Sequence, residues 1–217
     1  MIIAKILRRD GIKIPTVKEA MEQILADGIS EILVQPTHLV NGIENDQMKE
    51  DVRSFESAFT SISFGEPLLS STEDQEKAIQ AVMAEFTELT EKQALVFMGH
   101  GTTHYANSVY GALDYMMKDL GYSNAFLGTV EAYPSFDTLM KKVGELRPEK
   151  VLLAPFMVVA GDHAIHDMSG EDEDSWRSRF EAAGFNVECI MKGLGEYPGI
   201  RKLYIEHAKT AAANLKN

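Results

Sequence analysis

The chain has 217 residues, of which 45% are hydrophobic and 25% charged, a composition typical of a folded globular protein with a sizeable core. Asp and Glu number 33 against 21 Lys and Arg, so the formal net charge is −12, which argues against nucleic-acid binding. No apolar run reaches the roughly 20 residues that span a bilayer, and no secretory signal opens the chain. The single Cys189 cannot form an internal disulfide. We therefore expect a cytoplasmic protein without membrane association.

Short apolar segments alternate with amphipathic segments along the whole chain. In the first half we expect helices at 1–9, 17–27 (capped by Thr16 and Glu19), 45–59 and from 71 or 72 to about 89, with strands at 31–35 and 62–64. In the second half we expect strands at 94–98, 125–130, 150–154 and 185–190, with helices at 104–120, 135–146, 174–183 and 199–215. This alternation predicts an α/β fold with parallel sheets of four or five strands.

The two halves resemble each other at an offset of 119 residues. The stretch at 32–44 (ILVQPTHLVNGIE) matches the stretch at 151–163 (VLLAPFMVVAGDH) at four positions, Leu33/Leu152, Pro36/Pro155, Val40/Val159 and Gly42/Gly161. Chance similarity of two strand–Pro–loop segments is one explanation, and duplication is the other. Duplication predicts two lobes, residues 1–90 and 91–217, meeting near Thr90–Gln93, with the last helix packing on the first lobe. The counterpart of strand 94–98 would precede Met1, so we expect the first lobe to lack its first strand.

Three expected strand ends carry groups that can bind a metal. His100 follows strand 94–98, Glu131 follows strand 125–130, and His163 follows strand 150–154. Ligands of open parallel sheets bind beyond the carboxyl ends of the strands, and two imidazoles with one carboxylate suit Zn, Co, Fe or Ni. Each residue alone has an ordinary role in a loop or at a helix start. His38 follows the equivalent strand end of the first lobe, where it either faces the same cleft or packs in its loop.

Four stretches carry a resemblance to a known family. They are QPTHLVNGIE from residue 35, MGHGTTHYANSVYGALD from residue 98, GTVEAYPS from residue 128 and APFMVVAGDHAIHDMSGEDEDSW from residue 154. Together they resemble the anaerobic cobalt chelatase (sirohydrochlorin cobaltochelatase) family of CbiK type, which are class II tetrapyrrole chelatases. The resemblance implies two similar chelatase-like lobes with an active-site cleft between them, and His100, Glu131 and His163 as metal ligands. Family members begin with a strand and an SFGTS-like loop that are not found here.

The resemblance also implies an activity. We expect a metal-inserting lyase that places Co²⁺ into sirohydrochlorin, or a precorrin-2-level tetrapyrrole, in anaerobic cobalamin synthesis. His100 and His163 are the catalytic candidates, and which of them accepts a pyrrole proton stays open. His38, Tyr105, Tyr133 and Phe156 are candidates for substrate contact, with the core as the alternative for the aromatic rings. No GxxxxGK[ST] sequence is present, so we expect no nucleotide cofactor.

Other functions remain compatible with the sequence. The same donors suit Fe²⁺, Ni²⁺ or Zn²⁺, so a chelatase for sirohaem-type products is a close alternative. A non-catalytic tetrapyrrole or metal carrier belongs to a different class, and the missing first strand is the feature that favours it. A metal hydrolase would need a metal-bound water and a positioned base, and neither HExxH nor a nucleophile elbow occurs. The expected partner is sirohydrochlorin, and the sequence is compatible with a homo-oligomer.

Overall fold

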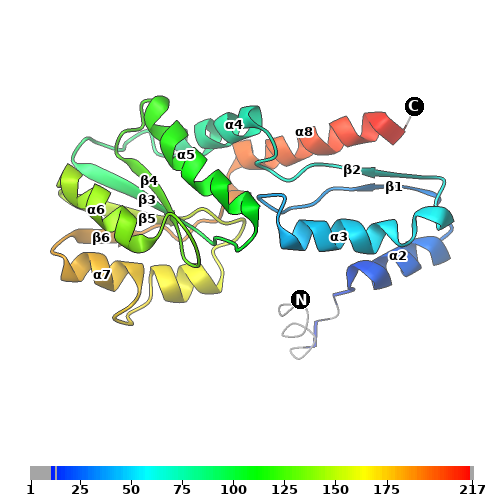
Figure 1. The fold of residues 1–217 in the computed structure, drawn as a ribbon, viewed down its shortest axis with the longest axis horizontal. Helices are drawn as coiled ribbons and strands as arrows, with labels where there is room; N and C mark the ends of the chain where they lie inside the picture. Colours follow the sequence, from blue (N-terminus) through cyan, green and yellow to red (C-terminus); the bar gives the residue numbers. More distant parts are fainter. Residues whose placement is uncertain (1–10, 13, 216–217) are drawn as a thin grey trace.

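The computed structural model describes residues 11–12 and 14–215, so the helix predicted at 1–9 lies outside the described residues. Two α/β lobes lie side by side along the longest axis of the molecule (Figure 1). Both lobes contain parallel strands flanked by helices, as the sequence predicts. None of the helices in the described part is long and apolar enough to cross a membrane.

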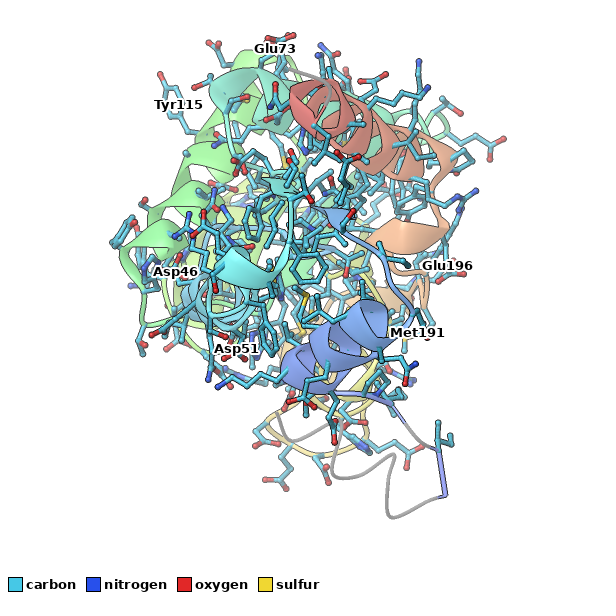
Figure 2. All side chains as sticks on the ribbon, turned by 90° about the vertical axis from the view of Figure 1, so that its right-hand side faces the viewer. Asp46, Asp51, Glu73, Tyr115, Met191 and Glu196 are labelled. Atoms are coloured by element: carbon cyan, nitrogen blue, oxygen red, sulfur yellow. The ribbon has the colours of Figure 1, made fainter. Side chains whose placement is uncertain are left out.

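The first lobe is small. Its sheet has two parallel strands, β1 (Glu31–Val34) and β2 (Ser61–Phe64). Helices α2 (Val17–Ala26) and α3 (Ile43–Arg53) lie on one side of these strands and α8 (Pro198–Leu215) on the other (Figures 1 and 2). The prediction of four or five strands is therefore wrong for this lobe as far as the structure describes it. Only β1 and β2 form in the described residues up to 70, and helices already cover both faces of this pair.

The second lobe contains a larger, four-stranded sheet. Its strands are β3 (Gln93–Gly99), β4 (Ala125–Thr129), β5 (Lys150–Pro155) and β6 (Asn186–Cys189), all parallel in the order β4-β3-β5-β6. Alternation along β3 divides the core, because Leu95 and Phe97 face one side while Val96 and Met98 face the other. The sheet therefore buries both faces, which explains why its strands are almost continuously apolar.

Helices cover both faces of this second sheet. On the Phe97 face pack α4 (Thr72–Met83) and α5 (Ser108–Asp119), and on the Val96 face pack α6 (Phe136–Leu146), α7 (Trp176–Ala182) and a π-helix (Ala164–Met168). Short 3₁₀ turns lie at Glu56–Ala58, Tyr105–Asn107 and Leu194–Glu196. The π-helix falls where the sequence predicts only a loop. Helix α4 ends at Met83 rather than near Leu89, and the amide of Phe86 donates to the Met83 carbonyl at 3.0 Å in a closing turn.

Helices α4 and α8 join the two lobes. Ile79 of α4 and Ile200 of α8 belong to the same core as Phe97 in the second lobe. From there α8 runs back along β1 and β2 of the first lobe (Figure 1). The Ser63 hydroxyl in β2 donates to the Ala211 carbonyl at 2.7 Å. The lobe boundary near residue 90 stays a prediction, because α4 precedes it in sequence and yet packs on the second sheet.

One histidine of α8 strengthens this connection. The ring nitrogens of His207 lie 2.9 Å from the Glu66 carbonyl and 3.0 Å from the Asp74 carboxylate. Burial alone would raise the pKa of Asp74, but hydrogen bonds from Ser71 and His207 hold the pKa below its ordinary value. Helix α8 is thus tied both to the loop after β2 and to the first turn of α4.

Candidate metal centre

The loops after β3 and β4 are held together by backbone hydrogen bonds that continue the sheet. The amide of Val130 donates to the Gly99 carbonyl and the amide of Glu131 donates to the His100 carbonyl, both at 3.0 Å. Gly101 has a φ of +85°, and a Cβ at this position would lie 3.0 Å from the backbone nitrogen of Ala132. Glycine therefore permits the turn and the close approach that place His100 beside Glu131.

The third side chain comes from the segment after β5. One ligand atom each from His100, Glu131 and His163 lies within 4.8 Å of the others. His100 Nε2 is 3.7 Å from Glu131 Oε1, and the two imidazole rings are 4.6 Å apart between centroids. The three side chains keep 46%, 56% and 35% of their surface exposed. Two imidazoles and one carboxylate that face solvent can hold a divalent ion and leave coordination positions open.

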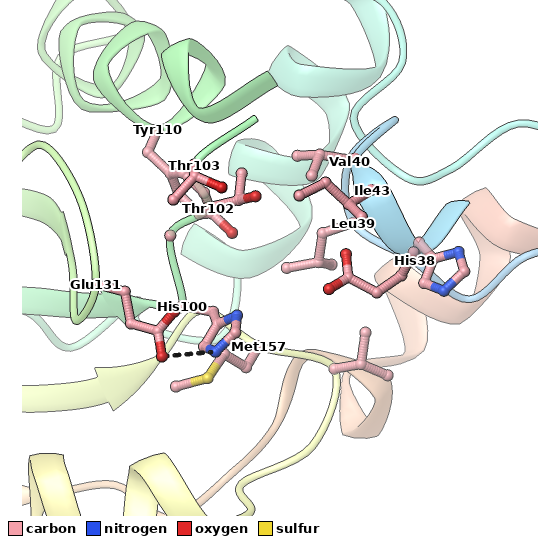
Figure 3. A pocket seen from close by; sticks show the side chains of 14 residues that line it. His38, Leu39, Val40, Ile43, His100, Thr102, Thr103, Tyr110, Glu131 and Met157 are labelled. Carbon is pink, nitrogen blue, oxygen red and sulfur yellow. Dashed lines mark ion pairs between the residues drawn. The ribbon is translucent and has the colours of Figure 1, made fainter. Parts of the chain in front are cut away.

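A pocket of about 430 Å³ lies between the lobes, next to these residues (Figure 3). Apolar side chains dominate much of its wall, with Leu39 and Val40 from the first lobe and Met157 from the second. His100 and Glu131 face one another at one end, and His38 lies across the pocket from them (Figure 3). The complete lining is His38, Leu39, Val40, Gly42, Ile43, Glu44, His100, Gly101, Thr102, Thr103, Tyr110, Glu131, Met157 and Val158.

Comparison with known proteins identifies the family. The model of the cobalt chelatase (CbiK) family matches residues 1–213. The chain belongs to the cobalt chelatase family. The resemblance predicted from the motifs is therefore confirmed.

Two curated relatives and one solved structure show how far this chelatase resembles known proteins. The chain is 39% identical over 211 residues to the sirohydrochlorin cobaltochelatase of Salmonella typhimurium, covering 97% of this chain and 80% of that protein. It is 30% identical over 206 residues to the sirohydrochlorin cobaltochelatase CbiKC of Nitratidesulfovibrio vulgaris, covering 94% and 73%. The sirohydrochlorin chelatase SirB from Bacillus subtilis subspecies spizizenii, solved in complex with cobalt, has the same fold, with a TM-score of 0.65 at 15% identity over 94% of this chain and 78% of that one.

Of the four residues predicted to contact substrate, the structure brings one to the pocket of this chelatase. His38 lines the pocket, with Nδ1 3.4 Å from Asn45 Oδ1. Tyr105 is 83% exposed and stacks on His104 outside the lining, and Tyr133 is 65% exposed at a separate surface depression. Phe156 is fully buried, with its ring 5.6 Å from that of Phe97, because the residue still hydrogen-bonds in the register of the sheet and its side chain turns into the core.

Several pocket residues were not predicted. Tyr110 is buried at the pocket wall, and burial raises the pKa of its phenol above the ordinary value despite a hydrogen bond with the backbone of Gly101. Tyr110 therefore offers a neutral hydroxyl. Glu44 also lines the pocket, and the repeat could have identified it, because Glu44 is the position equivalent to His163. Asp167 contacts His163, and in the sequence only the spacing of four residues between them indicated this contact.

Proposed function

We propose that this chain inserts Co²⁺ into sirohydrochlorin, or a precorrin-2-level tetrapyrrole, without ATP. The observation that carries the proposal is the convergence of His100, Glu131 and His163 beside a cleft between two lobes, in a member of the cobalt chelatase family. In this reaction the metal is a substrate. It must be bound firmly enough to be positioned and loosely enough to be released into the macrocycle.

The donor set suits such a transfer. Three protein groups leave coordination positions open for water and then for the pyrrole nitrogens, unlike a closed four-cysteine site. Insertion also removes two pyrrole protons, and a neutral imidazole is a competent base near pH 7. His100 and His163 both stand beside the proposed ion. We assign the proton acceptor to this pair without choosing between them.

The pocket wall suits the flat face of a macrocycle. Leu39, Val40 and Met157 offer apolar contact, while the neutral Tyr110 hydroxyl and His38 offer hydrogen bonds. The substrate carries carboxylates around its rim, and the chain carries a net charge of −12, so long-range attraction does not bring them together. We therefore expect the substrate carboxylates to point out of the cleft into water.

Anaerobic incubation with sirohydrochlorin and Co²⁺ tests the proposal. Metal insertion changes the absorption spectrum of the macrocycle, and its rate should exceed the rate without protein. The variant His163→Ala should return the rate to the uncatalysed value while circular dichroism stays that of the folded chain. A wild-type rate equal to the rate without protein would contradict the proposal and favour a non-catalytic carrier.

The identity of the inserted metal is tested in a separate experiment. Fe²⁺, Ni²⁺ and Zn²⁺ suit the same donors, so each is supplied in place of Co²⁺ and the values of kcat/KM are compared. We expect Co²⁺ to give the highest value. A higher value with Fe²⁺ or Ni²⁺ would assign the chain to sirohaem-type or nickel products instead.

A further inference from the structure

His163 is held by a carboxylate on its own helical turn. Its Nδ1 lies 2.5 Å from Oδ2 of Asp167, four residues later. The intervening chain forms the π-helix Ala164–Met168, in which the amide of Ser169 donates to the Ala164 carbonyl at 3.1 Å. Single π-helical turns are rare and are frequently found at functional sites. The geometry therefore points to a role for Asp167 in orienting the His163 side chain.

The core fixes this turn. Ala164 and Met168, the residues directly after His163 and Asp167, are both fully buried in the core that contains Trp176. The Ser169 hydroxyl donates to the Ala164 carbonyl at 2.8 Å and closes the turn. A buried pair at this spacing fixes the backbone of the turn, so packing sets the positions from which the His163 and Asp167 side chains, 35% and 45% exposed, meet.

This contact selects one form of the imidazole ring. A carboxylate offers only acceptors, so Nδ1 of His163 must carry the proton that Asp167 accepts. The neutral ring then has its lone pair on Nε2, which points away from Asp167. His104 shows the opposite arrangement, because its Nδ1 accepts from the amide of Ala106 at 3.2 Å.

We propose that Asp167 is a positioning residue that holds His163 as the Nδ1–H tautomer, with the Nε2 lone pair presented to the ion shared with His100 and Glu131. Outer carboxylates of this kind typically strengthen metal binding by about 10–100-fold. The metal-binding part of this inference rests on the proposed function. The tautomer is a property of the protein without metal, so the two can fail separately.

The tautomer is measured first, on the metal-free protein. Long-range ¹H–¹⁵N NMR spectra distinguish a protonated Nδ1 from a protonated Nε2. We expect Nδ1–H at His163 in the wild type and in Asp167→Asn, whose amide oxygen still accepts the proton. In Asp167→Ala we expect the Nε2–H form to dominate, while His104 keeps its own tautomer in every variant. Nδ1–H retained by His163 in Asp167→Ala would overturn the proposal.

Co²⁺ titration without tetrapyrrole is the second readout. Asp167→Ala should weaken Co²⁺ binding by about tenfold or more, and Asp167→Asn by only a few-fold. Glu171→Gln is the matched control, because it removes an exposed negative charge four residues further along the same segment, and it should bind as the wild type does. Equal losses in Asp167→Asn and Asp167→Ala would show that charge alone matters and would overturn the positioning role. A wild type that binds no Co²⁺ would contradict the proposed function and leave the tautomer result standing.

Discussion

The two lobes face one cleft but contribute to it differently. The second lobe has four strands packed between two helical layers, and all three candidate metal ligands come from the segments that follow its strands β3, β4 and β5. In its described residues the first lobe has two strands and one small core, and it supplies wall residues such as His38 and Leu39. The more extensively packed sheet thus positions the three candidate ligands, while the smaller lobe closes the cleft.

Residues at equivalent positions of the two lobes show the same difference in their contribution to the cleft. Strands β1 and β2 pair in parallel as β5 and β6 do, and the matched prolines Pro36 and Pro155 stand at the ends of β1 and β5. In the repeat, Glu44 corresponds to His163, and Glu44 lines the same pocket. One position in a repeated framework thus carries a carboxylate on one side of the cleft and an imidazole on the other.

Substituting His163 gives the largest expected effect, and substituting the equivalent Glu44 provides the comparison. His163→Ala should lower kcat/KM for Co²⁺ insertion by about a thousandfold or more, since it removes a proposed ligand, a loss of roughly 4 kcal/mol in transition-state stabilisation. Glu44→Gln should lower it by less than about tenfold, because Glu44 only lines the wall. Anaerobic insertion kinetics measure both, with circular dichroism as the check on folding. Similar losses in the two variants would mean that both lobes bind the metal.

Ion pairs in the two lobes are expected to contribute differently to the free energy of unfolding. Asp114 in α5 is 4% exposed and binds Lys118 at 2.6 Å and Lys142 at 2.8 Å, whereas Lys18 and Asp51 of the first lobe form an ion pair at 3.5 Å in which the Lys18 side chain is 60% exposed. Asp114→Ala should cost about 3 kcal/mol of unfolding free energy, because it leaves the buried Leu127 amide without an acceptor and the partly buried Lys118 without its carboxylate. Lys18→Ala should cost less than about 1 kcal/mol. Urea unfolding compares them, and equal costs would contradict the distinction.

The buried carboxylate of Asp114 also predicts that stability depends on pH. Burial alone would raise the pKa of Asp114, but hydrogen bonds from Lys118, Lys142 and the Leu127 amide hold the pKa below its ordinary value of 3.8. Burial lowers the pKa of Lys118 below its ordinary value of 10.5, but the group is still cationic in the acid range in which Asp114 titrates. The stabilisation is therefore complete above pH 3.8 and is lost as the pH falls through the lower folded pKa. The gap in melting temperature between wild type and Asp114→Asn should narrow below about pH 4. A constant gap would show that Asp114 is not the titrating group.

Core truncations test whether the larger lobe also dominates stability. Met117 in α5 is fully buried in the large core, and Met21 in α2 is 3% exposed in the small one. Met117→Ala should cost about 4 kcal/mol, near the upper end for buried methionine, because the surrounding sheet and helices cannot close the cavity. Met21→Ala should cost about 2 kcal/mol, since a small core relaxes more easily. Chemical denaturation gives both values, and a larger cost at Met21 would reverse the comparison.

Sequence patterns predicted the second lobe better than the first. The strands around Phe97 and Leu127 are continuous apolar runs between clear turns, and metal-capable residues directly follow them, so both the sheet and the convergence of His100 with Glu131 could be expected. The strands of the first sheet were also expected, at 31–35 and 62–64, but its limit of two strands in the described residues was not, because helices α2, α3 and α8 already cover both of its faces. The sequence did not show which way the aromatic candidates face: Phe156 turns into the core and Tyr133 to solvent, because the direction of a side chain near a strand end depends on sheet register.

The contact of α8 with the first sheet gives the smallest expected effect. The Ser63 hydroxyl is buried and donates to the Ala211 carbonyl at 2.7 Å, joining β2 to the end of α8 across 148 residues. Ser63→Ala removes this hydrogen bond without leaving a buried donor, so it should cost about 1 kcal/mol. Ser54→Ala is the matched control, because its hydroxyl bonds locally to Asp51 at an exposed helix end and should cost less than about 0.5 kcal/mol. Equal stability of the two variants in urea would mean that this hydrogen bond contributes nothing measurable, and that α8 is held on the first lobe by packing and by its other contacts, such as that of His207 with the Glu66 carbonyl.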